Sequence, residues 1–116
     1  MFEEAILVMD ARSSSESVRS SDYGRIRHGS DWTRLYKAQD LYLDISLQRN
    51  QDQSVLIGQL IAMKEGVEFV GSISTKNQRF LPLNDRGGFR IILEPGLHDL
   101  HLHLGSDLIV VRGLEA

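Results

Sequence analysis

Apolar and polar residues alternate along several short stretches of this chain, and the alternation predicts β-strands. From Leu41 to Gln48, leucine or isoleucine occupies every second position, so one face of an extended segment is apolar and the other can meet water. The segment from His98 to Leu104 repeats this pattern most regularly. A helical period of 3.6 residues is sustained almost nowhere, and the pattern therefore indicates an all-β fold.

Further strands are predicted where β-branched residues and leucine gather between turn residues. Gly58 lies inside one of them, where a missing side chain permits a bulge or close packing by a neighbour. Pro82 indicates an edge strand or a strand end, because proline cannot donate to a ladder. These further strands are Ala5–Met9, Val55–Ala62, Val67–Ser74, Arg79–Leu83, Phe89–Glu94 and Leu108–Val111. Together they give about seven or eight short antiparallel strands, spaced as a two-sheet sandwich requires.

Two other segments interrupt this pattern. Asn84 to Gly87 has the residues of a tight turn and predicts a hairpin between the strands on either side. Serine and arginine crowd the stretch from Asp10 to Thr33, in which Val18 and Ile26 are the only branched aliphatic residues. Loops of this length inside a domain are normally functional or disordered. We therefore expect a mobile loop at about residues 10–33 that is a candidate interaction site.

From Val55 onward, about half of the chain resembles the carboxypeptidase-regulatory-like domain family, whose members are small transthyretin-like sandwiches. The residues that carry the resemblance are Leu56, Gly58 and Leu60, the Asn84–Gly87 turn with Gly88 and Phe89 after it, and Pro95, Gly96, His98 and Leu100. The chain departs from the family at His98, where an inward tyrosine is usual, and Val70 to Ser72 match its middle segment poorly. The resemblance implies an immunoglobulin-like or transthyretin-like sandwich, found in bacterial proteins among others, that binds or supports another protein without catalysis.

Composition excludes several classes of protein. The chain has 116 residues, 41% of them hydrophobic and 25% charged, which fits one domain over residues 1–116. Sixteen acidic residues against 13 basic ones give a net charge of −3, so nucleic acid is a poor candidate partner. There is no cysteine, and no apolar run approaches the ~20 residues that span a bilayer. The acidic start, Met1 to Glu4, does not resemble a signal peptide, and we expect a cytoplasmic protein that does not bind membranes.

Two groups of residues are candidates for binding. His101 and His103 share one strand face with Asp99, a spacing that suits a metal ion, a solvated surface or a pH-sensitive contact. Because no further ligand can be identified, we predict no metal site and no cofactor. The second group is a set of basic and aromatic residues that suits contact with a polyanion or a protein partner. Its candidate contact residues are Arg25, Arg27, Trp32, Arg34 and Tyr36. Interspersed acidic residues favour the alternative, a solvated loop that ends in Trp32 as a core anchor.

No catalytic residues are predicted. Most serines lie in the loop, where no scaffold fixes them, and none sits in a G-x-S-x-G elbow. We therefore expect a noncatalytic interaction or structural module that docks a partner protein or a second copy of itself. The alternative is a sandwich that binds a small ligand or carbohydrate on exposed aromatic rings such as Tyr42 or Trp32. Strand number and spacing also leave a single barrel open as an alternative architecture.

Overall fold

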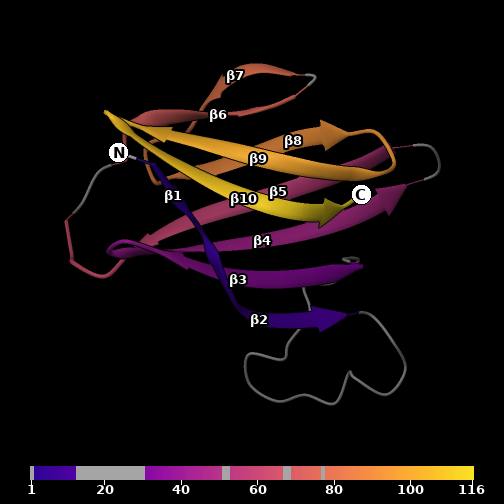
Figure 1. The fold of residues 1–116 in the computed structure, drawn as a ribbon, viewed down its shortest axis with the longest axis horizontal. Helices are drawn as coiled ribbons and strands as arrows, with labels where there is room; N and C mark the ends of the chain where they lie inside the picture. Colours follow the sequence, from indigo (N-terminus) through magenta and orange to yellow (C-terminus); the bar gives the residue numbers. More distant parts are fainter. Residues whose placement is uncertain (1, 13–30, 51–52, 67–68, 77) are drawn as a thin grey trace.

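Ten β-strands form the protein in a computed structural model, which describes residues 2–12, 31–50, 53–66, 69–76 and 78–116 (Figure 1). The strands are β1 (Phe2–Glu4), β2 (Ile6–Arg12), β3 (Trp32–Ala38), β4 (Leu41–Asn50), β5 (Gln53–Ala62), β6 (Gly71–Thr75), β7 (Gln78–Pro82), β8 (Gly88–Leu93), β9 (Leu97–Leu104) and β10 (Asp107–Glu115). These ranges contain no helix, and accordingly none that could cross a membrane. The fold is all-β, as predicted.

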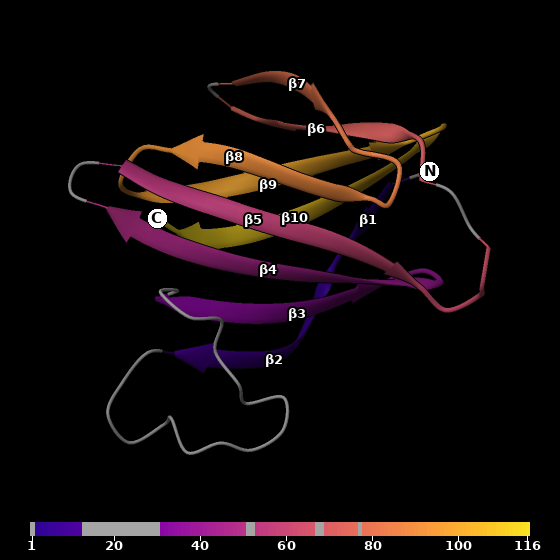
Figure 2. The same ribbon diagram turned by 180° about the vertical axis from the view of Figure 1, so that it is seen from behind.

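The strands form two stacked sheets of five strands each. One sheet has the order β1-β10-β9-β6-β7, and the other has the order β2-β3-β4-β5-β8. The first sheet lies in front in Figure 1, and Figure 2 shows the second sheet from the opposite side. The order leaves four edge strands, which are β1 and β7 in one sheet and β2 and β8 in the other. Two stacked sheets agree with the predicted layered arrangement and not with a single barrel.

An apolar core fills the space between the sheets. Alternate residues of β4 point inward, and Ile45 and Leu47 are fully buried there. The facing sheet contributes Leu100 and Leu102 of β9, whose intervening residue His101 lies on the other face. Gly58 has no register shift, so there is no bulge at this position. Instead the ring of Phe89 packs against its backbone from β8, which is the close packing that the sequence allowed.

The chain changes sheet at Ala5. β1 pairs in parallel with β10, whereas β2, only one residue later, pairs antiparallel with β3 in the other sheet. Ala5 itself is buried, and its backbone N–H donates to the carbonyl of Val110 over 2.9 Å. This corner holds the start of β2 in place at the outer margin of its sheet.

Several predicted elements need correction. The structure has ten strands and not seven or eight, and the β1–β10 pair is parallel. The Asn84–Gly87 turn forms, but it joins strands of different sheets, so there is no β7–β8 hairpin. β6 begins only at Gly71. The predicted loop at 10–33 is too long at both ends, because β2 extends to Arg12 and β3 begins at Trp32. Residues 13–30 lie outside the described residues.

Candidate interaction site at the β2 edge

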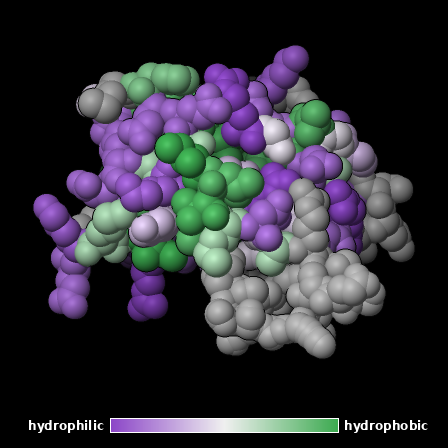
Figure 3. All heavy atoms as spheres, turned by 60° about the horizontal axis from the view of Figure 1, so that its bottom comes forward, coloured by the Kyte–Doolittle hydropathy of each residue, from purple (hydrophilic) through white to green (hydrophobic). Residues whose placement is uncertain are grey.

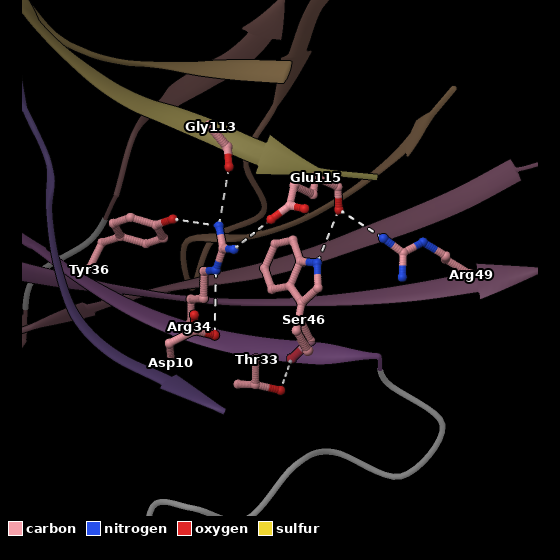
Figure 4. A network of polar contacts seen from close by, with 9 residues as sticks. Asp10, Thr33, Arg34, Tyr36, Ser46, Arg49, Gly113 and Glu115 are labelled. Atoms are coloured by element: carbon pink, nitrogen blue, oxygen red, sulfur yellow. Dashed lines mark hydrogen bonds and ion pairs between the residues drawn. The ribbon is translucent and has the colours of Figure 1, made fainter. Parts of the chain in front are cut away.

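β3 turns three of the predicted contact residues toward the interior. Trp32, Arg34 and Tyr36 alternate with outward residues along the strand and have exposed fractions of 1%, 6% and 4%. Arg34 and Tyr36 approach β10 of the facing sheet, as Figure 4 shows. Their burial leaves almost no surface for a partner to contact. The other two residues of this group, Arg25 and Arg27, lie outside the described residues.

The buried guanidinium of Arg34 is held by groups from both sheets (Figure 4). Its Nη1 donates to the Tyr36 hydroxyl and to the Gly113 carbonyl, each over 3.3 Å. Its Nε lies 3.6 Å from Asp10 Oδ1, and its Nη2 lies 3.6 Å from Glu115 Oε1. A buried cation is tolerated only when such partners replace water. The network therefore joins β2 and β3 to β10 across the core.

Trp32 extends this network. Its Nε1–H donates to the Glu115 carbonyl over 3.0 Å, and its ring lies 4.4 Å below the Arg34 guanidinium carbon. Cation–π contact and a satisfied indole N–H are both typical of a tryptophan that stabilises the fold. A buried ring cannot serve as a stacking platform for a sugar. This placement removes one of the two aromatic residues on which the ligand-binding alternative depended.

His101 and His103 lie on the outer face of their sheet, as predicted. Their ring centroids are 6.5 Å apart, and the ring of Phe80 contacts His103 edge-on at 4.7 Å. Ser74 Oγ lies 3.1 Å from His103 Nε2. Burial, and after it the neighbouring imidazole of His101, lowers the pKa of His103. His103 therefore favours the neutral imidazole on a face that is partly exposed.

This histidine face lacks the parts of a catalytic or metal site within the described ranges. No group of three or more histidine, aspartate or glutamate side chains there could hold a metal ion. Ser74 and His103 are the hydroxyl and base of a dyad, but no carboxylate bonds the imidazole among the hydrogen bonds of the described residues. Asp99, the nearest acid in sequence, instead accepts from Gly113 N and pairs with Arg112.

The surface that stands out lies along β2. Four consecutive apolar side chains are exposed on this edge strand, with exposed fractions of 67% for Ile6, 46% for Leu7, 47% for Val8 and 42% for Met9. Figure 3 turns this edge forward and shows apolar side chains gathered near its centre. A strand that packs by one face exposes apolar residues singly, because successive side chains point to opposite faces. Exposed apolar residues at four successive positions of β2 are therefore more than the packing of one strand face requires.

The outer side of β2 also carries backbone groups that none of the ten described strands pairs. β2 bonds β3 on one side only, and a register shift between Leu7 and Met9 bends the strand at Val8. Natural edge strands are usually short, charged or interrupted by proline, which prevents pairing with other chains. The run from Ile6 to Met9 has no charged residue and no proline, and the bulge at Val8 is its one interruption. Beside this run lies a hollow of about 520 Å³, lined in part by Leu7, Arg34 and Tyr36.

The other three edges are better protected. β1 has only three residues, two of them glutamate. β7 has five residues and ends in Pro82, which offers no backbone donor. On β8 the two exposed side chains, Arg90 and Ile92, are separated by a buried residue. Among the four edges, β2 is therefore the one that combines length with a continuous apolar surface.

The sequence contained a signal for this site. Ala5 to Met9 was predicted as a strand, but a run of apolar residues is equally compatible with a strand buried on both faces. Only the strand order places the run at an edge.

No family model, curated protein or solved structure matches this chain. Because fold class alone does not determine function, the functional argument depends on the site itself.

Proposed function

We propose that this chain is a noncatalytic interaction module that docks a partner protein along the free edge of β2. The observation that carries the proposal is the run from Ile6 to Met9, four exposed apolar side chains on an edge strand that pairs with β3 alone among the described strands. An extended segment of a partner can add to such an edge, with main-chain hydrogen bonds giving affinity and side-chain contacts giving specificity.

The hollow beside the edge supports this proposal. It lies where the chain changes sheet, and its lining combines the apolar Ile6 and Leu7 with the charged Arg34 and Arg112. A side chain of an added strand that points inward would enter this space. A lining that is partly apolar and partly charged favours some partner side chains over others, since a side chain that leaves a charge unpaired binds less well.

The fold is compatible with the family resemblance, which implies an interaction role without catalysis. We infer a transthyretin-like sandwich related to the carboxypeptidase-regulatory-like domains, on the basis of the two stacked sheets and the Asn84 turn. In that turn Asn84 Oδ1 accepts from the backbone N–H groups of Arg86 and Gly88, at 2.9 Å and 2.8 Å. Gly87 has a φ of 82°, a left-handed backbone conformation that glycine adopts in turns without steric cost.

The proposal is tested by photo-crosslinking in a lysate of the native host. Photo-methionine incorporated at Met9, with 42% exposure on β2, is compared with photo-methionine at Met63, with 49% exposure beyond β5. We expect a discrete crosslinked protein from Met9 and none from Met63, because only Met9 lies on the docking edge.

A matched pair of substitutions serves as the control. Val8→Lys places a charge on the edge, whereas Ile61→Lys places one at a similarly exposed position, 47% against 45%, on the central strand β5. Val8→Lys should abolish the Met9 crosslink, and Ile61→Lys should preserve it. Equal crosslinking from Met63, or a Met9 crosslink that survives Val8→Lys, contradicts docking at β2.

A further inference from the structure

We infer that the occupant of the β2 edge is a second copy of this chain, which pairs antiparallel with the first across a twofold axis between the two β2 strands. This inference rests on the proposed docking function and names its partner. The two edges would join two five-stranded sheets into one continuous sheet. A twofold contact uses the same patch on both copies, so the patch must complement itself.

The side-chain pattern of β2 satisfies that requirement. Ile6 is opposite Lys37 of β3, and Met9 is opposite Leu35. Lys37 and Leu35 alternate with the buried residues of β3, so they face away from the core. Directly opposite residues share a face, and Ile6 and Met9 therefore both point outward. An antiparallel register that centres between Leu7 and Val8 places Ile6 of each copy against Met9 of the other, on the same face.

The charges around the run do not oppose this pairing. No charged residue lies between Ile6 and Met9, so the centre brings no like charges together. Glu3 and Glu4 precede the run but lie on β1, in the other sheet, where Glu4 pairs with Arg112 at 3.2 Å and Glu3 accepts from Gln39 N over 3.0 Å.

Asp10 does not disturb this arrangement. It is opposite Arg34 in the β2–β3 register and turns toward that guanidinium, at 3.6 Å from Nε. Its negative charge is thereby balanced within its own chain. The edge that a second copy meets is accordingly apolar at its centre and neutral overall along β2.

The protection of the remaining edges determines the size of the assembly. Among the described edge strands, β1 has three residues, β7 ends in proline and β8 exposes Arg90 and Ile92 on either side of a buried residue, so β2 is the one with a continuous apolar run. A single self-complementary edge closes after two copies and cannot extend into a filament. We therefore expect a dimer as the largest species.

Sedimentation equilibrium over a wide range of concentrations tests this inference. We expect a reversible monomer–dimer equilibrium for the native chain. Val8→Lys should raise the dimer dissociation constant about 100-fold, because the twofold axis places two lysines in one apolar contact. Ile61→Lys, of similar exposure, should leave it unchanged within about twofold. Leu7→Lys is the second edge variant if Val8→Lys does not fold, and circular dichroism checks all three.

Crosslinking of the purified protein locates the contact. Photo-methionine at Met9 should give a dimer crosslink to Ile6 or Leu7 of the other copy, and Met63 should give none. A chain that stays monomeric at every concentration overturns the inference, as does a dimer that survives both edge variants. The proposed docking function fails separately, when the Met9 crosslink to a lysate protein is absent as well.

Discussion

The neighbouring strands β2 and β3 differ in which side chains they expose to solvent. β3 buries a charged residue, Arg34, between the sheets, whereas β2 exposes four large apolar residues at the edge. The buried arginine is surrounded by partners from both sheets, so β3 serves the stability of the fold. Within the described part of the chain, the apolar residues of β2 meet no strand on their outer side, so they contribute little to that stability. The contrast separates residues that hold the fold together from residues that are available for association.

The largest effect should follow the removal of the buried charge. Arg34→Met removes the ion pairs that Arg34 forms with Asp10 and Glu115, and we expect the free energy of unfolding to fall by about 3 kcal/mol, the low end for a broken buried pair because Glu115 is half exposed. Urea denaturation measures the loss.

Arg49→Met is the matched control for this prediction. The Arg49 side chain is 49% exposed and pairs with Asp31 at 3.5 Å. An exposed ion pair contributes at most about 1 kcal/mol, so this variant should unfold close to the native midpoint. Equal losses for the two arginines would mean that the Arg34 network does not join the sheets.

A smaller loss is expected from Trp32→Phe. This change removes the hydrogen bond from Nε1 to the Glu115 carbonyl and leaves unfilled space in the core, at a cost of about 2 kcal/mol. Thermal unfolding followed by circular dichroism measures it. An unchanged melting temperature would show that the ring is not part of the core packing.

Substitution on β2 should have little effect on the stability of the monomer. Val8→Lys, at 47% exposure, should change the free energy of unfolding by less than about 0.5 kcal/mol at concentrations where the protein is monomeric. Urea denaturation at low protein concentration measures this. A loss as large as that of Arg34→Met would mean that the edge is part of the folding core, and the contrast between the strands would disappear.

The smallest effect concerns pH. Because the pKa of His103 is lowered in the folded protein, the unfolded chain binds the proton more readily, and protonation favours unfolding. The stability contribution is present above pH 6.5, the ordinary histidine value, and declines as the pH falls toward the lower folded value. Urea midpoints from pH 7.5 to 5 should show a decline that His103→Gln reduces.

The sequence predicts the strands whose inward residues are uniformly apolar. β4, β8 and β9 follow this rule and were identified by alternation, whereas β5 was identified by its β-branched residues and leucine. β3 was not predicted, because Arg34 occupies an inward position and interrupts the alternation of apolar residues. Its burial depends on Glu115 and Gly113, about 80 residues later, and no local pattern reports such partners.

The candidate site was predictable only in part. The apolar run of β2 is visible in the sequence, yet its position at an edge depends on a strand order that pairs β1 with β10 and β2 with β3. The basic and aromatic residues drew attention because such side chains are common in interfaces. In the structure, Trp32 and Tyr36 instead stabilise the contact between the sheets.

Hydrogen exchange of the β2 amides at several protein concentrations tests the central claim most directly, because strand pairing protects backbone groups that side-chain contact does not. We predict that exchange between Ile6 and Ala11 slows as the concentration rises, while exchange in the edge strand β7 stays constant. Association with unchanged exchange in β2 would contradict the claim that this edge is the docking site.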